Sequence, residues 1–183
     1  AMAKGSVDLS ISELFLRENR HILYLRILRI LLAMIAGSGL AVSGITLQAI
    51  LRNPLAEPYL CGTSSGAGVG AVAALILGIG GLYLPLAAFL GALLTAALVY
   101  LIARQGSRVA AQSLILSGVI VSVALSGIIV FFISFFDNKG LHDILWWLWG
   151  SLQIYDFKLL SMVAAIVIAG ILSINLFSQD LNA

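Results

Sequence analysis

Side chains that could carry out chemistry are few and widely separated in this 183-residue sequence. The two histidines, His21 and His142, have no second histidine or cysteine at helical spacing, and the single cysteine, Cys61, cannot form an internal disulfide or a multi-cysteine metal site. No phosphate-binding loop of the form G-x-x-x-x-G-K-S/T occurs. We therefore predict that the chain is not an enzyme, has no catalytic residues, and holds neither a cofactor nor a metal ion.

The amino-acid composition indicates a membrane protein. Hydrophobic residues make up 61% of the chain and charged residues 10%, against about 25% charged residues in a soluble protein. The net charge of +2 is too small to indicate binding to nucleic acid. Backbone groups in lipid must bond internally, and the apolar runs do not alternate as barrel strands would. We predict an all-α, multi-pass bundle of about five transmembrane helices, at residues 30–51, 64–79, 84–103, 113–136 and 159–177.

Residues 52–58, Arg-Asn-Pro-Leu-Ala-Glu-Pro, separate the first two apolar runs, and we call this segment the elbow. Pro54 has no N–H to donate and disfavours helix at Asn53, so a helix must break here. A break at membrane depth is tolerated only where it is buried in protein or lines a cavity. We predict that Asn53, Pro54 and Leu55 form a gate, and a plain interfacial turn is the alternative.

Small and aromatic residues indicate how the helices are placed. Gly62, Gly66 and Gly70 recur every four residues, which puts a smooth stripe on one helix face and favours close helix packing. The stretch 141–157 is rich in tryptophan, a residue that prefers the membrane–water interface. We predict a short interfacial helix there; an aromatic cage for a ligand is the less favoured alternative.

Basic residues cluster before the first apolar run. They are Lys4, Arg17, Arg20, Arg26 and Arg29. A count of Lys and Arg near the ends of the spans would place this end of the chain in the cytoplasm.

Several motifs together resemble one family, the permease subunits of type II ABC importers for iron-siderophores, haem and cobalamin. The motifs are Arg-Ile-Leu-Arg at 26–29, Ala-Val-Ser-Gly at 41–44, the elbow, and Gly-Thr-Ser-Ser-Gly-Ala-Gly at 62–68, with weaker matches at 116–119 and 146–151. The match resembles helices two to six of about ten in that family. The chain is therefore expected to be a fragment, a partial permease domain over residues 1–183, that ends before the helices which dock on the ATPase.

The resemblance reverses the orientation and implies partners. Segment 1–29 would be extracytoplasmic, residues 30–183 would hold the transmembrane helices, and the elbow would face the cytoplasm. The whole protein would lie in the inner (plasma) membrane as a homodimer and pair with an ATP-binding subunit and a substrate-binding protein. Arg26 and Arg29 would dock carboxylates of that binding protein, although anchoring to lipid headgroups is an alternative use for them.

The same resemblance implies site residues and exposes departures from the family. Asn53 and Leu55 align with an inner, cytoplasmic constriction. Ala111 and Gln112 stand where a family member has Thr-Ser at another constriction, which puts that gate in doubt. Leu28 replaces a common proline, which allows the helix to begin before Arg26.

Two other classes of protein remain open from the residues alone. A self-contained secondary transporter or channel would need intramembrane charges or a selectivity ring, and neither is visible. A membrane-embedded enzyme would need paired Asp or His residues in the spans, and none occurs. The leading prediction is thus a permease fragment that moves an iron-siderophore, haem or cobalamin-type solute with the energy of a separate ATPase.

Overall fold

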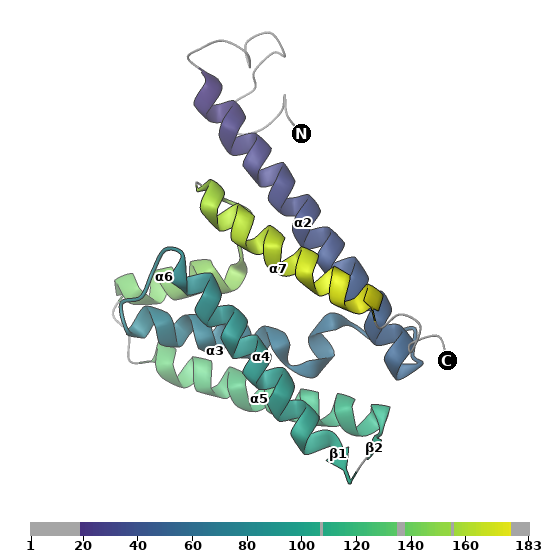
Figure 1. The fold of residues 1–183 in the computed structure, drawn as a ribbon. Coiled ribbons are helices and arrows are strands. Elements are labelled where there is room, and N and C mark those ends of the chain that lie inside the picture. Colours follow the sequence, from purple (N-terminus) through teal and green to yellow (C-terminus); the bar gives the residue numbers. More distant parts are fainter. Residues whose placement is uncertain (1–18, 107, 135–137, 155, 177–183) are drawn as a thin grey trace. The chain divides into compact units, whose positions relative to one another are not determined.

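The computed structural model describes residues 19–106, 108–134, 138–154 and 156–176. Its elements, in chain order, are α2 (Arg20–Leu51), the short 3-10 helix η2 (Pro58–Cys61), α3 (Thr63–Ile76), α4 (Tyr83–Ala103), strands β1 (Arg104–Gln105) and β2 (Arg108–Val109), α5 (Ala111–Ile133), α6 (Asn138–Trp149) and α7 (Phe157–Leu176) (Figure 1). The all-helical prediction is confirmed. The two strands form only a tight antiparallel hairpin between α4 and α5, with Arg104 opposite Val109.

Four of the described helices are long and apolar enough to cross a membrane, namely α2, α4, α5 and α7. The shortest of these, α7, has 20 residues, which at 1.5 Å per residue gives about 30 Å, the thickness of the hydrocarbon core. The apolar helix α3 has only 14 residues and reaches about 21 Å. The predicted span 64–79 is therefore a shorter helix than expected.

The ends of two helices differ from the predicted ends for local reasons. Helix α3 stops at Ile76 because Gly78 adopts a left-handed conformation (φ 70°) and the Ile79 N–H bonds back to the Ala74 carbonyl at 2.8 Å. This is the Schellman arrangement, which ends a helix and satisfies its last carbonyls. Helix α2 begins at Arg20 rather than near residue 30. Leu28 stands where the family commonly has a proline, and a proline there would disfavour a helix through this basic segment. The early start of α2 agrees with the expectation drawn from that replacement.

The chain divides into two compact units, and each is described by itself. The first unit comprises residues 1–43 and 152–183, and the second comprises residues 44–151. In the first unit, the beginning of α2 packs on the start of α7 through a small apolar cluster. The buried members of this cluster are Leu28, Ile154 and Leu160, with Leu31, Leu32, Ile35 and Leu159 packed around them.

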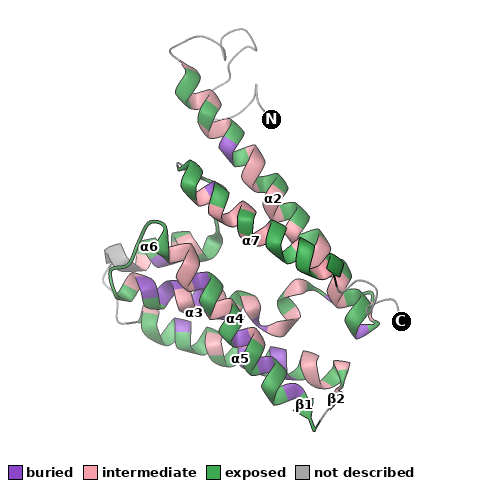
Figure 2. Cartoon of the chain, viewed as in Figure 1, coloured by how far each residue is buried: buried purple, intermediate pink, exposed green. Residues whose placement is uncertain are grey.

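The core of the second unit lies on α3. Helix α3 contacts α4, α5 and α6, and α4 and α5 also contact each other. Figure 2 shows the buried residues gathered on α3, and an apolar cluster of Val72, Ile129 and Ile144 joins α3, α5 and α6. A short helix that is surrounded by its neighbours can thus position the longer helices beside it.

Glycines let α3 and α4 touch through their backbones. A Cβ atom added to Gly91 of α4 would collide with the carbonyl oxygen of Gly66 on α3, and one added to Gly70 of α3 would collide with the carbonyl oxygen of Ala87 on α4. Gly66 would in turn meet Thr95 and the Gly91 carbonyl. We call this contact the α3–α4 seam; it is formed by Gly66 and Gly70 of α3 and by Ala87, Gly91 and Thr95 of α4. Packing through small residues is the way in which membrane helices approach each other most closely.

The seam generates a test by substitution. Gly91→Ala should lower the free energy of unfolding by about 1–3 kcal/mol, because its methyl group must push the α3 backbone away. The matched control is Gly127→Ala on α5, where an added Cβ has no atom within 4 Å and alanine favours helix. The measurement is thermal unfolding of the detergent-solubilised chain followed by circular dichroism. Equal midpoints for the two variants would contradict the seam.

Candidate functional site

The elbow begins where α2 ends with a left-handed residue that is not glycine. Arg52 has φ 48°, the only positive φ among the described non-glycine residues. The Asn53 N–H bonds to the Gln48 carbonyl at 3.2 Å and the Arg52 N–H bonds to the Ala49 carbonyl at 3.3 Å. These two bonds make a Schellman end in which Arg52 occupies the position that usually belongs to glycine. The carbonyl groups of Gln48 and Ala49 are therefore satisfied within the protein.

Asn53 holds the next turn together. Its side-chain Oδ1 accepts a hydrogen bond from the Leu55 N–H at 3.0 Å, and its carbonyl accepts one from the Ala56 N–H at 3.1 Å. The Gln48 Nε2 reaches across to donate to the Ala56 carbonyl at 3.4 Å. Asparagine favours such turns because its side chain can imitate a backbone acceptor. The sequence analysis predicted Asn53 as part of a gate, which stays a prediction, and it did not predict the hydrogen bond that Gln48 makes across the turn.

The two other residues of the predicted gate are exposed. Pro54 lies at the surface of the elbow, and the Leu55 side chain is 82% exposed, whereas the adjacent Ala56 is 2% exposed. The turn therefore buries its small residue and projects its large apolar residue outward. The Leu55 side chain is therefore exposed on a turn that three hydrogen bonds fix.

The elbow leads into a crowded contact with α5. Pro58 begins η2, and Gly62 follows in a left-handed conformation (φ 70°) as the N-cap of α3. Gly62 thus lies before the helix rather than on the helix face shared by Gly66 and Gly70. A Cβ added to Gly118 of α5 would collide with the carbonyl oxygen of Leu60.

Small polar side chains lie around Gly62. A Cβ on Gly62 would lie 3.1 Å from the Ser122 Oγ and 3.2 Å from the Thr95 Cγ2. Ser122 donates to the Gly118 carbonyl at 2.7 Å, and Thr95 is 6% exposed. Sequence reasoning missed Thr95 and Ser122. Thr95 is the one non-aromatic hydroxyl of the apolar helix α4, whereas Ser122 is one of four serines of α5, so nothing in the sequence distinguishes Ser122 from the others.

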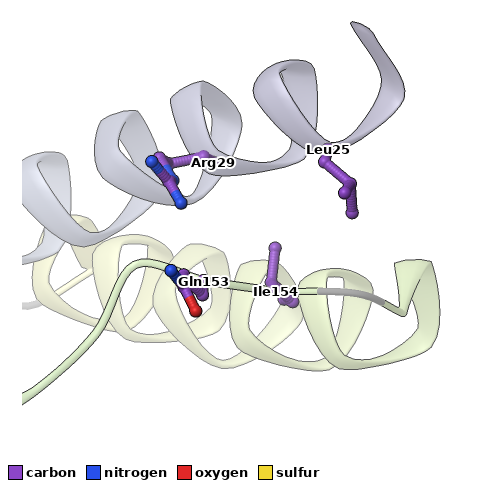
Figure 3. Close-up of a pocket in the computed structure, with 4 residues that line it drawn as sticks. All are labelled: Leu25, Arg29, Gln153 and Ile154. Carbon is purple, nitrogen blue, oxygen red and sulfur yellow. The ribbon is translucent and has the colours of Figure 1, made fainter. Parts of the chain in front are cut away.

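The predicted docking residues differ in their surroundings. Arg26 is half-buried and Arg29 is exposed, although both lie on α2 in the first unit. Arg29 also lines a cavity with residues of the connection between α6 and α7, and Arg26 does not (Figure 3). The elbow residues belong to the second unit, so the two predicted sites are described separately.

Other residues named in the sequence analysis lie at the start of α5 and on α6. Ala111 and Gln112 open α5 directly after the hairpin, where the Arg104 Nε donates to the Gly106 carbonyl at 2.7 Å. On α6, the Trp146 Nε1 donates to the His142 Nε2 at 2.5 Å, and the two rings meet edge to face. In the described stretches no group of three or more His, Cys, Asp or Glu side chains could hold a metal ion.

Comparisons with known proteins agree on one family. The sequence profile of the FecCD transport family matches residues 1–183. The cobalamin import system permease protein BtuC of Halobacterium salinarum is 35% identical over 159 residues, which is 86% of this chain and 43% of that protein. The vitamin B12 import system permease protein BtuC of Escherichia coli O6:H1 is 34% identical over 146 residues, which is 78% of this chain and 44% of that protein.

Two further comparisons concern another permease and a solved structure. An uncharacterised ABC transporter permease, YvrB of Bacillus subtilis, is 34% identical over 164 residues, which is 86% of this chain and 46% of that protein. A solved inward-facing conformation of a transporter assigned to the metal-chelate ABC type superposes with a TM-score of 0.85 at 29% identity, over 99% of this chain and 58% of that chain. The chain thus spans less than half the length of these curated relatives.

The left-handed Arg52 provides a test of the elbow. Arg52→Gly should leave the free energy of unfolding unchanged or slightly raised, because glycine adopts positive φ without strain. Arg52→Val should lower it by about 1–3 kcal/mol, because a β-branched residue is a strong outlier at positive φ. Thermal unfolding of both variants provides the measurement. If valine were tolerated as well as glycine, the helix end described above would be wrong.

Proposed function

Because the chain belongs to the FecCD transport family over residues 1–183, we propose that it lines the membrane path of an ATP-driven importer. The family consists of transport proteins, and the chain is a multi-pass membrane permease of the ABC importer type rather than an enzyme. In this proposal the chain does no chemistry of its own. ATP is hydrolysed by a separate subunit, and the permease alternates between conformations that open to either side of the membrane.

We propose a large chelate as the solute: an iron-siderophore, haem or a cobalamin-type compound. Relatives named for cobalamin import support the class. The composition of the helices supports it too, because α4 and α5 carry no charged residue, and small hydroxyls such as those of Thr95 and Ser122 are polar groups near Gly62. A bulky solute that shields its own charge needs no buried counter-charge in its path. Competition among the three solute classes in uptake assays would identify which one is carried.

The proposed partners follow from the same family. The whole permease would form a homodimer, bind two ATP-binding subunits, and receive solute from an extracytoplasmic substrate-binding protein. Relatives described as permeases of import systems support this assembly. The lipid bilayer is the remaining partner, and nucleic acid has no part in the proposal.

The observation that carries the proposal is the elbow. It is a non-helical break between an apolar helix that is long enough to span the membrane and a shorter helix that is buried among its neighbours. The break presents Leu55 outward on a turn fixed by Asn53. We propose that Asn53, Pro54 and Leu55 form the cytoplasmic gate of the path, so that the side chain of Leu55 narrows the path when the importer is closed to the cytoplasm.

The gate is tested by thiol labelling in the whole importer. Cysteine is placed at position 53 or 55 in a Cys61→Ala background, and the rate of labelling is measured with and without ATP. We expect ATP to change the rate at both positions by severalfold, because alternating access changes their exposure. Leu77→Cys is the control: this residue is 73% exposed at the end of α3 and should label at one rate throughout. Labelling rates at positions 53 and 55 that do not change when ATP is added would favour the alternative, a plain interfacial turn.

The docking role of Arg26 and Arg29 is tested by reversing their charge. The double variant Arg26→Glu, Arg29→Glu should bind the substrate-binding protein roughly tenfold more weakly or worse, because carboxylates would then face carboxylates. The salt dependence of binding should also flatten or reverse. Arg104→Glu is the control: Arg104 follows α4, and two helices, α3 and α4, separate it from the elbow, so the proposal puts it on the cytoplasmic side with the elbow. An unchanged affinity across a salt series would leave lipid anchoring as the role of these arginines.

A further inference from the structure

The side chain of Gln48 joins two parts of the chain that the elbow separates. Gln48 lies in the last turn of α2, and its Nε2 donates a hydrogen bond to the Ala56 carbonyl at 3.4 Å. The left-handed Arg52 and the helix-breaking Pro54 stand between these two residues in the sequence. Both Gln48 and Ala56 belong to the second unit, so their contact lies within one compact part of the chain.

The elbow lies back along the last turns of α2. A Cβ atom added to Gly44 would lie 3.9 Å from the Pro58 Cγ, so the end of the elbow passes beside α2 one turn before Gln48. Gly44 and Gln48 are four residues apart and therefore share a face of the helix. That face of α2 lies against the elbow at two points, Pro58 and Ala56.

The Gln48 amide reaches further along the elbow than the backbone bonds that end α2. Those backbone bonds come from the N–H groups of Arg52 and Asn53. The following turn is bonded within itself, because the N–H groups of Leu55 and Ala56 donate to the side-chain oxygen and the carbonyl of Asn53. The bond from Gln48 ties the far end of that turn to α2, so it sets the angle at which the turn lies on the helix.

The angle of this turn decides where the Leu55 side chain lies. Ala56 is buried and its neighbour Leu55 is exposed, so Gln48 holds the residue directly beside the projecting leucine. A rotation of the turn about its start would move Leu55 and stretch the contact between Gln48 and Ala56, which is already longer than a typical N–H···O bond. One neutral hydrogen bond adds little net free energy, so this one can break and form again in each transport cycle.

We propose that Gln48 is a positioning residue of the gate, and we call its bond to the Ala56 carbonyl the clasp. The clasp holds Leu55 in place while it is closed, as it is in the described structure, and releases the turn when it opens. The inference deepens the proposed function and rests on it, because it adds Gln48 to the gate of Asn53, Pro54 and Leu55. Gln48 acts through Leu55 and does not itself have to contact the solute.

The experiment measures the thiol labelling of Leu55→Cys in the whole importer, in the Cys61→Ala background, with Gln48 changed. Gln48→Met keeps the length of the side chain but removes the donor, and Gln48→Glu keeps its shape but presents an acceptor to the Ala56 carbonyl. Both variants should reduce the ATP-dependent change in labelling rate by roughly two- to tenfold, which is the ratio of populations that one neutral hydrogen bond controls. Gln105→Glu is the control, because it makes the same chemical change at an exposed glutamine of the hairpin and should leave this change intact.

A fourth variant separates positioning from packing. Gln48→Lys restores an N–H donor on a side chain of sufficient reach, so it should recover most of the ATP-dependent change that Gln48→Met loses. A role in packing alone predicts the opposite order, because methionine matches the shape of glutamine more closely than lysine does. Gln48 is exposed, so all of its variants should fold, and thermal unfolding of each one provides the check.

Each contrary result has a distinct meaning. An ATP-dependent change at position 55 that is equally large with Gln48, Gln48→Met and Gln48→Glu would overturn the clasp and leave the proposed gate standing. A change that Gln48→Met keeps and Gln48→Lys loses would assign Gln48 to packing and also overturn the clasp. A labelling rate that does not change when ATP is added to the importer with Gln48 intact would remove the proposed gate itself, and the clasp with it.

Discussion

Lipid offers no hydrogen bonds, and this constraint governs the described structure more than any other. Every backbone N–H and C=O at membrane depth has to find its partner inside the protein. Regular helices meet this condition along their length, and the difficulty is concentrated at their ends. The chain meets it twice by the same means, at Arg52 and at Gly78, where a left-handed residue turns the backbone so that the following N–H groups reach the last carbonyls. The elbow exists as a defined shape because its own groups bond to one another.

The same constraint explains the small residues. Hydrophobic burial gives little reason for one apolar helix to prefer another over lipid, so close packing has to supply the attraction. Along the α3–α4 seam, the absence of a Cβ atom at Gly66, Gly70 and Gly91 lets the backbones of the two helices come into contact. The Ser122 hydroxyl bonds to the carbonyl of Gly118 one turn earlier on its own helix. The contacts between these helices are therefore made by small, uncharged residues.

Hydropathy was enough to predict the existence and order of the helices, because apolar length is the property that lipid selects. Their ends were harder to predict. The start of α2 lies among arginines, whose charge indicates a surface location but not a change of backbone conformation, and the early stop of α3 depends on one positive φ at Gly78. The elbow was predictable in place from Pro54 but not in detail, since the bond from Gln48 to Ala56 joins residues on either side of the break. The difference between Arg26 and Arg29 depends on where residues 153 and 154 fold back, and no local pattern around residue 26 contains that information.

The backbone contact between α3 and α4 has a mechanical consequence. Where side chains separate two helices, rotamer changes allow one helix to slide along the other by small amounts, which is how shear motions occur. At this seam Gly66, Gly70 and Gly91 have no rotamers to change, and a Cβ atom at any of these three positions would collide with a carbonyl oxygen of the facing helix. Helices α3 and α4 should therefore move as one piece. Any rearrangement that opens a path must be absorbed by segments with adjustable torsions, and the elbow that precedes α3 is one of them.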